Sequence, residues 1–163
     1  MYNGMALDTD VIANTALPGV VPQSPPNVAA FGGSNAVTLL QGTPALTTVY
    51  ADSTISFLDF HYFYFGCVLA DKNGLASAPQ SCTLTVRGRD TNGNVVATQQ
   101  FSFTQNGLQQ QMIKATLNSA FVRLQSAEFE VEPVGALAVS NATVDAIADN
   151  FSYTVYSTQF LSS

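Results

Sequence analysis

The sequence predicts an all-β protein, an antiparallel β-sandwich with at most one short helical turn. Three observations support this fold class. Short stretches rich in β-branched and aromatic residues recur along the 163 residues, and Gly, Pro and Asn turn signals separate them. The dipeptide Asn92-Gly93, typical of a hairpin turn, lies between two such stretches. In several stretches apolar and polar residues alternate, as they do when a sheet buries one face.

The length fits a single domain, 1–163, that buries one core. Five of the seven prolines lie within residues 1–46, so we expect this part to be an extended, turn-rich segment. The main strands are expected within 47–156, followed by a tail, 157–163. The expected strands are residues 55–65, 82–88, 95–103, 112–117, 127–131 and 151–156.

The stretch from Phe57 to Cys67 holds six aromatic rings and the only histidine of the chain. Apolar side chains occupy both parities of this stretch, which predicts a central strand covered on both faces and ended by Gly66 and Cys67. His61 is the only base available for a Ser–His–Asp triad, and Asp59 at i−2 is the residue that would orient it. Without a nucleophile elbow, we interpret His61 as a partly exposed strand residue and expect no enzyme.

The two cysteines, Cys67 and Cys82, each adjoin a predicted strand, and a polar loop lies between them. Two such strand ends can bring the sulfurs together, so we expect a disulfide; two buried thiols are the alternative. A disulfide is typical of an extracellular protein, and the sequons at Asn141 and Asn150 agree with secretion. No basic and apolar leader follows Met1, so we expect the signal peptide to be absent from this chain.

Two later stretches allow more than one interpretation. The apolar residues of 113–124 recur at helical spacing, but 112–117 also alternates, so we expect a strand and then a short helical turn near 119–124. Glu128, Glu130 and Glu132 share one strand face. A pair of carboxylates is what glycoside hydrolysis needs. We favour a solvated edge strand whose charges discourage further pairing.

Composition excludes two classes of partner. The net charge is −6 and the five basic residues are scattered, so the chain lacks the basic surface that nucleic acid requires. No apolar run is long enough to span a membrane as a helix.

Several short motifs follow one another in a characteristic order along the chain. They are Tyr2-Asn-Gly, Pro26-Asn-Val, the Phe57 to Cys67 stretch, Ser81-Cys-Thr-Leu-Thr-Val-Arg-Gly-Arg-Asp and Asp149-Asn-Phe-Ser-Tyr-Thr-Val-Tyr. Their order resembles a family of fungal secreted proteins with a galactose-binding-like, jelly-roll fold. Chains of that family usually carry a further strand with acidic residues ahead of the position of Tyr2, and we expect this sequence to lack that strand.

The resemblance implies a non-catalytic module that binds carbohydrate of a cell wall or extracellular glycan. It implies that Asp149, at the head of the last strand, helps to hold a structural calcium ion; the alternative is a side-chain-to-backbone turn with Asn150. We expect the ligand site at a loop-built end of the sandwich. The candidate ligand-binding residues are Tyr50, Asp52, His61, Tyr62, Asn73 and Gln80.

A structural or adhesive surface protein that self-associates is the alternative function. Low charge and abundant Thr, Ser and Gln suit pairing through an open sheet edge.

Overall fold

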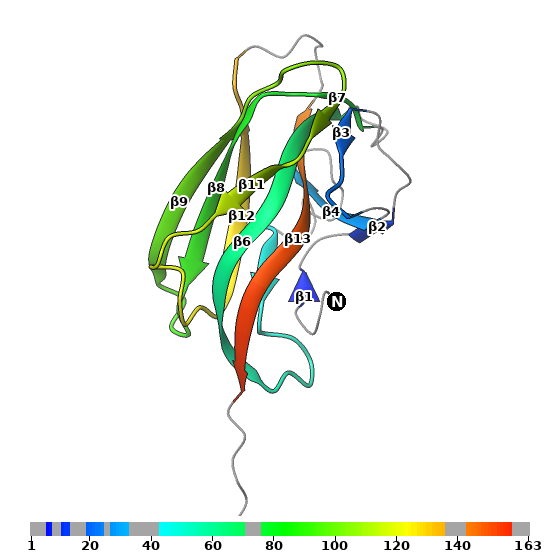
Figure 1. Cartoon of the computed structure of the whole chain (residues 1–163). Coiled ribbons are helices and arrows are strands. Elements are labelled where there is room, and N and C mark those ends of the chain that lie inside the picture. Colours follow the sequence, from blue (N-terminus) through cyan, green and yellow to red (C-terminus); the bar gives the residue numbers. More distant parts are fainter. Residues whose placement is uncertain are drawn as a thin grey trace, which may run out of the picture.

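The computed structural model describes residues 6–7, 11–13, 19–24, 27–32, 43–70, 76–135 and 143–157. Within these residues every regular element is a strand, and two sheets lie face to face as a β-sandwich (Figure 1). The predicted all-β, antiparallel sandwich is therefore confirmed. The finer expectation of a jelly roll stays a prediction.

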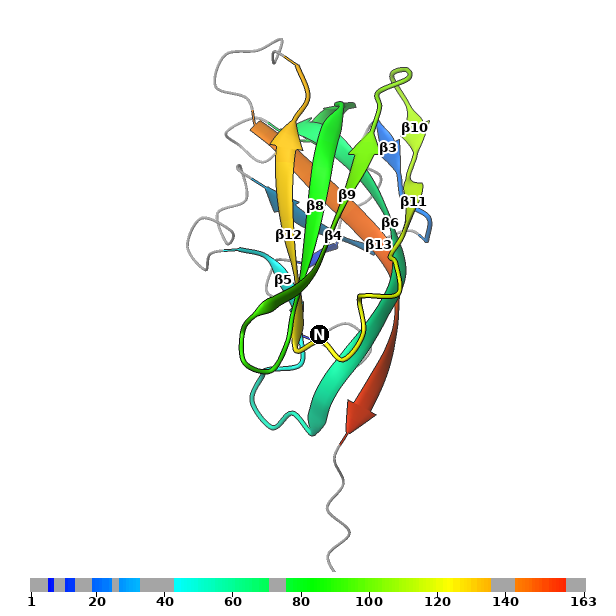
Figure 2. The ribbon, with the colours of Figure 1, turned by 90° about the vertical axis from the view of Figure 1, so that its left-hand side faces the viewer.

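The first sheet, called the β8 sheet, has the order β1-β5-β12-β8-β9, and its described pairs are antiparallel. Figure 2 shows β9 at the rim of this sheet. The strands are β1 (Ala6–Leu7), β5 (Ala45–Thr47), β12 (Ser126–Pro133), β8 (Cys82–Arg89) and β9 (Val95–Phe103).

The second sheet, called the β6 sheet, has the order β11-β6-β13-β4-β2, and β7 also pairs with β6. A short parallel pair, β10 with β3, completes the described strands. The strands are β2 (Val11–Ala13), β3 (Val20–Val21), β4 (Asn27–Gly32), β6 (Ile55–Ala70), β7 (Ala76–Pro79), β10 (Gln110–Gln111), β11 (Ile113–Thr116) and β13 (Thr143–Ser157).

Phenylalanine rings fill the space between the two sheets. Phe63 of β6 lies 5.6 Å from Phe129 of β12, and Phe31 of β4 lies 5.1 Å from the same ring, centroid to centroid. Burial of these large side chains is the main stabilising term for such a sandwich. The fully buried phenylalanines are Phe31, Phe60, Phe63, Phe65, Phe103, Phe121 and Phe129.

The predicted disulfide between Cys67 and Cys82 is confirmed, and it joins the two sheets. Cys67 lies in β6 and Cys82 begins β8, with Cα atoms 6.2 Å apart. Both residues are fully buried. The bridge therefore fixes one sheet against the other at the end where β8 starts.

The hairpin predicted at Asn92-Gly93 is confirmed, since β8 and β9 pair along their lengths. Gly93 N–H donates to Asp90 O at 3.0 Å, and of the dipeptide only Gly93 has a positive φ, 81°. The connection is therefore a four-residue turn whose last residue is left-handed, and the tighter two-residue turn, with both central residues at positive φ, does not form.

β6 and β13 are the strands that extend furthest beyond their predicted ranges. β6 continues through Gly66 and Cys67 to Ala70, so the glycine does not end it. A Cβ on Gly66 would lie 2.6 Å from Val20 Cγ1, so the glycine allows β3 to approach. β13 begins at Thr143, which places Asp149 in mid-strand instead of at the head.

The expected helical turn near 119–124 is a hydrogen-bonded turn, with Phe121 N–H donating to Asn118 O at 3.2 Å. The backbone beyond it runs beside β6, where Leu58 and Leu124 exchange two bonds of 2.8 Å. Phe121 and Leu124 are therefore spaced as in a helix because both side chains are buried in the core, although the segment that carries them is irregular.

The edge-strand interpretation of the glutamate strand is wrong, because β12 lies inside its sheet between β5 and β8. Its glutamates do share the outer face, where Arg89 donates to Glu128 at 2.6 Å and Arg87 donates to Glu130 at 2.5 Å. These cross-strand ion pairs balance the charge of a strand that has neighbours on both sides.

Candidate functional site

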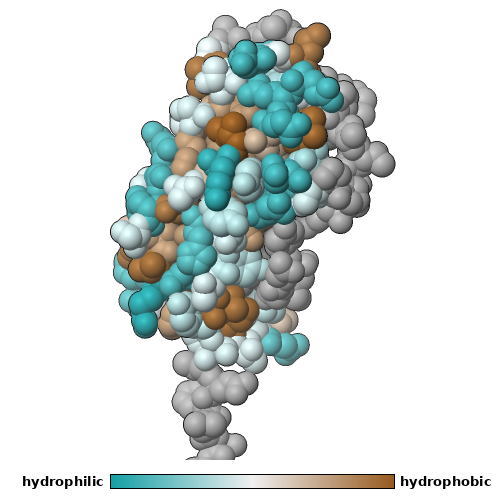
Figure 3. Space-filling view, viewed as in Figure 1, coloured by the Kyte–Doolittle hydropathy of each residue, from teal (hydrophilic) through white to brown (hydrophobic). Residues whose placement is uncertain are grey.

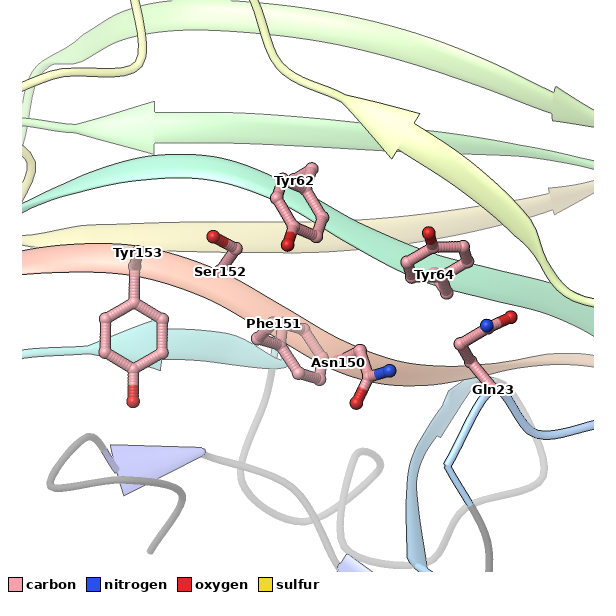
Figure 4. Close-up of a pocket in the computed structure, with 7 residues that line it drawn as sticks. All are labelled: Gln23, Tyr62, Tyr64, Asn150, Phe151, Ser152 and Tyr153. Carbon is pink, nitrogen blue, oxygen red and sulfur yellow. The ribbon is translucent and has the colours of Figure 1, made fainter.

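An open groove of about 640 Å³ lies on the outer face of the β6 sheet, over β6 and β13. Tyr62 and Tyr64 project from β6, and Gln23 approaches from the segment after β3 (Figure 4). None of the lining side chains carries a charge. The lining residues are Gln23, Tyr62, Tyr64, Asn150, Phe151, Ser152 and Tyr153.

A bulge at His61 turns the two tyrosines outward. Leu58 and Phe60 are buried, and beyond His61 the buried positions are Phe63 and Phe65, so the parity changes by one residue. The register of the two strands shows the same bulge. Phe60 pairs with Tyr153 and Tyr62 pairs with Ser152, so two steps along β6 correspond to one step along β13. An extra residue in one strand reverses the side-chain alternation beyond it. The prediction that both faces of this strand are covered is therefore wrong at Tyr62 and Tyr64, which are half-buried.

A second bulge, on β13, shapes the other side of the groove. Asn150 adopts φ 51°, and the pairing skips one residue between Asp149 and Ser152. Asparagine is among the few residue types that adopt this conformation readily. The bulge places Asn150 and Ser152 beside the rings of β6 (Figure 4).

The carboxylate of Asp149 ties the segment after β3 to this bulge. It is 2% exposed and accepts hydrogen bonds from Ser24 N–H at 2.6 Å, Ser24 O–H at 2.9 Å and Asn150 N–H at 2.7 Å. The bond to Asn150 matches the predicted side-chain-to-backbone turn. Because Ser24 adjoins Gln23, these bonds also hold one wall of the groove in place.

Calcium at Asp149 stays a prediction. The carboxylate oxygens already accept from the N–H groups of Ser24 and Asn150 and share the Ser24 hydroxyl with Asn150 Oδ1, and these contacts account for its burial without an ion. Within the described ranges, no group of three or more His, Cys, Asp or Glu side chains is arranged to hold a metal.

The two tyrosine rings meet edge to face, with centroids 6.2 Å apart. Lys114 of β11 places its Nζ 3.9 Å from the centroid of Tyr62. Contacts of this kind hold the rings in one orientation and keep a positive charge at the border of the groove.

A second aromatic pair lies on the same face, nearer the start of β6. Phe57 and Tyr156 stack with centroids 4.7 Å apart, and the Arg123 guanidinium lies 4.3 Å from the Phe57 centroid. The carboxylate of Asp59 accepts hydrogen bonds from the backbone N–H of Arg123 at 2.8 Å and from Tyr156 O–H at 3.0 Å. The hydrogen bond to Asp59 and the negative charge of that carboxylate raise the pKa of Tyr156 above its ordinary value.

The only histidine is exposed between the two aromatic pairs. His61 Nε2 lies 2.8 Å from Thr154 Oγ1, and the Asp59 carboxylate bonds to other groups, so it does not form the orienting pair that a triad would need. The expectation of a partly exposed strand histidine agrees with this position. The absence of enzyme activity stays a prediction.

The ligand residues predicted from the sequence do not come together. Tyr62 lines the groove and His61 lies just beyond it, whereas Tyr50 and Asp52 lie in the loop before β6. Gln80 lies just after β7 and beside β6, where its N–H donates to Cys67 O at 2.9 Å. Asn73 and the sequon at Asn141 fall outside the described residues.

The groove has members that the sequence indicated only in part. Tyr64 lies two residues after Tyr62, so strand alternation places both on one face. Gln23 carries no such signal, because only the folded chain brings it to β13.

Comparison with known proteins finds no family model that matches the chain and no curated protein with a similar sequence. The part of the chain that the structure describes contains no helix long and apolar enough to cross a membrane.

Proposed function

We propose that this protein is a secreted, non-catalytic module that binds carbohydrate in the groove over β6 and β13. The observation that carries the proposal is the pair Tyr62 and Tyr64, two partly exposed rings in an uncharged groove. Aromatic faces stack on the apolar faces of sugar rings, and amide and hydroxyl groups bond to sugar hydroxyls. Gln23, Asn150 and Ser152 supply such groups around the rings.

The Cys67–Cys82 disulfide supports the extracellular part of the proposal, because disulfides persist in oxidising compartments. The implied resemblance to galactose-binding-like domains is a second, independent support for the ligand class.

The test is affinity electrophoresis and calorimetry with a panel of soluble neutral and acidic polysaccharides. Tyr62→Ala and Tyr64→Ala are each expected to weaken binding by about 5- to 30-fold, as the loss of a central aromatic contact does. Thr98→Ala, on the outer face of the β8 sheet, is the matched surface control and should bind as the wild type does. Melting temperatures of all variants show that the folds are intact.

Two results would contradict the proposal. One is that no polysaccharide of the panel binds. The other is that Gln80→Ala abolishes binding while Tyr62→Ala does not, which would place the site at a loop-built end.

A second candidate function, self-association, is favoured by the edge strand β9. Its nine residues carry no charge, no proline and no glycine, and β8 is its only strand neighbour among the described residues. Edge strands are usually protected by such residues against pairing with another chain. A second copy of β9 could pair with the first in antiparallel register without meeting a like charge.

Light scattering over a concentration series tests self-association. If β9 pairs between copies, a variant with both Thr98→Lys and Ser102→Lys is monomeric where the wild type is dimeric. The control carries the same two charges in the flanking loops, as Thr91→Lys with Gln105→Lys, and should dimerise like the wild type. A wild type that stays monomeric at every concentration would exclude this candidate.

A further inference from the structure

The basic residues that the structure describes are divided between the two outer faces of the sandwich, and on only one of these faces do glutamates form ion pairs with them. The structure describes four of the five basic residues. Arg87 and Arg89 lie on the outer face of the β8 sheet, each in an ion pair with a glutamate of β12. Lys114 and Arg123 lie beside β6, and neither forms an ion pair with a carboxylate of the described residues.

Both of these cations rest on aromatic rings of the face that carries the groove. Lys114 covers Tyr62, which lines the groove, and Arg123 covers Phe57 near the start of β6. Figure 3 shows this face of the molecule, where pale and teal residues prevail and brown residues are scattered. A ring holds a cation in place without removing its charge, so both side chains can still bind an anion.

The acids of this face are already engaged within the protein. Asp145 and Asp149 are buried, and Ser24 bonds to the second of them. Asp59 accepts from two neutral donors, the backbone N–H of Arg123 and Tyr156 O–H, so it keeps its negative charge but is held in place by these bonds. All three glutamates of the chain lie on β12, so neither Lys114 nor Arg123 is paired with one, and the side chain of Asp59 bonds to the backbone and not to the guanidinium of Arg123.

The two cation–ring units are separated along one strand. Tyr62 and Phe57 lie five positions apart on β6, which corresponds to about 16 Å of strand. His61, Thr154 and Ser152 supply polar groups between the units. A ligand that reached both would have to be an extended chain, not a single sugar.

We propose that the groove takes an extended acidic polysaccharide with uronate carboxylates, which Lys114 and Arg123 bind while Tyr62 and Tyr64 stack on its rings. This inference rests on the proposed carbohydrate function and specifies its ligand class. A guanidinium bonds to a planar carboxylate through two parallel N–H groups, and an ammonium adds a point charge. Uronate is therefore preferred over a neutral glycan of the same length.

The experiment measures affinity by calorimetry for oligogalacturonate and for a neutral galactan of matched length. At about 20 mM salt the uronate is expected to bind at least about tenfold more tightly, and this advantage should shrink at about 500 mM salt, where charges are screened. Lys114→Gln and Arg123→Gln should each weaken uronate binding about three- to tenfold. Binding of neutral galactan should change little in either variant.

Matched controls separate these effects from net charge and from folding. Arg87→Gln and Arg89→Gln remove the same charge from the outer face of the β8 sheet and should leave uronate binding unchanged. Lys114→Arg keeps the charge and should retain most of the affinity, whereas Arg123→Lys keeps the charge but loses the two-bond contact and should bind between the wild type and Arg123→Gln.

The outcomes distinguish this inference from the function on which it rests. Equal affinity for both glycans, unaffected by Lys114→Gln and Arg123→Gln, would overturn the acidic preference and leave carbohydrate binding intact. Dextran sulfate that bound more tightly than uronate, with equal losses in all four Gln variants, would reduce the effect to unspecific charge attraction and also overturn it. Binding to neither glycan nor any other of the panel would remove the proposed function itself.

Discussion

At the scale of single residues, the buried carboxylate of Asp149 depends on one serine. Ser24 donates to it through both its N–H and its O–H. The Ser24 hydroxyl lies 2.9 Å from Asp149 and 2.7 Å from Asn150 Oδ1, so the two side chains share its one proton. Ser24→Ala removes this shared donor, and we expect the free energy of unfolding to fall by about 1 kcal/mol. Ser102→Ala, at an exposed serine of β9, is the control and should change it by less than about 0.5 kcal/mol. Urea denaturation measures both.

The same carboxylate offers a direct test for calcium. An ion bound only by the folded protein stabilises it, so a chelator would lower the melting temperature if calcium were a ligand of Asp149. With hydrogen bonds alone, the melting temperature should not change on chelation. A marked decrease would support the implied calcium site and would show that Ser24 and Asn150 are not the only partners of this carboxylate.

A second residue-scale prediction concerns the hairpin between β8 and β9. Asp90 accepts hydrogen bonds from Asn94 N–H and Asn92 N–H, both at 2.9 Å, and the bond from Asn94 is the main cause that lowers its pKa below 3.8. Because the folded pKa lies below the unfolded one, ionised Asp90 stabilises the fold above pH 3.8, and this contribution is lost as the pH falls through the folded pKa.

Asp90→Asn keeps an acceptor oxygen but cannot titrate. We therefore expect the melting temperature of the wild type to fall more steeply than that of Asp90→Asn between about pH 4 and about pH 2. Calorimetric scans at several pH values measure this. Parallel curves for the two proteins would contradict a stabilising role of the ionised form.

At the scale of elements, Gly66 decides how closely β3 can approach β6. Gly66→Ala would place a methyl group 2.6 Å from Val20 Cγ1, and Val20 is fully buried. We expect a loss of about 1 to 3 kcal/mol in the free energy of unfolding, typical of an overpacked site. Val20→Ala makes room, so the double variant should be more stable than the two single losses predict. Additive losses in urea denaturation would show that the two residues do not compete for space.

Elements were predictable where the signal is local. The β8–β9 hairpin was predicted from Asn92-Gly93 and the alternation around it. The pairing of the two strands confirms the hairpin. The start of β13 was missed because Asp145 resembles a turn residue in the sequence, and only the folded chain shows that it is buried within a strand. The bulge at His61 leaves no mark in the composition, since it arises from pairing with β13, about ninety positions away in the chain.

At the scale of the whole molecule, one covalent bond joins the two sheets. Cys67 and Cys82 close a loop of 15 residues, so the disulfide is expected to contribute about 3 kcal/mol to the free energy of unfolding. Reduction of the wild type should lower that free energy by about this amount. A Cys67→Ala, Cys82→Ala variant should be equally destabilised and should not respond to the reductant. An unchanged stability after complete reduction, checked by thiol titration, would contradict this.

Only some residues of the candidate site could be predicted from the sequence. The sequence indicated Tyr62 as a candidate ligand residue, but it predicted a strand covered on both faces and did not single out Tyr64. The loop residues Asp52 and Gln80 looked equally suitable by type, but the fold places Asp52 before the start of β6 and Gln80 beside Cys67, near the other end of that strand. Which polar groups surround the rings depends on the register of β13 and on the approach of Gln23, and long-range pairing of this kind is not encoded by any short motif.

The sequon at Asn150 lies within the groove itself, beside Tyr62 and Tyr64. A cell that attached an N-linked glycan there would deliver a protein whose groove is already filled by its own sugar. The choice of expression host thus becomes part of any binding assay. Protein from a bacterial cytoplasm presents the groove without a glycan. Ser152→Ala would also remove the sequon in a eukaryotic secretory pathway, but it takes away one of the hydroxyls that line the groove.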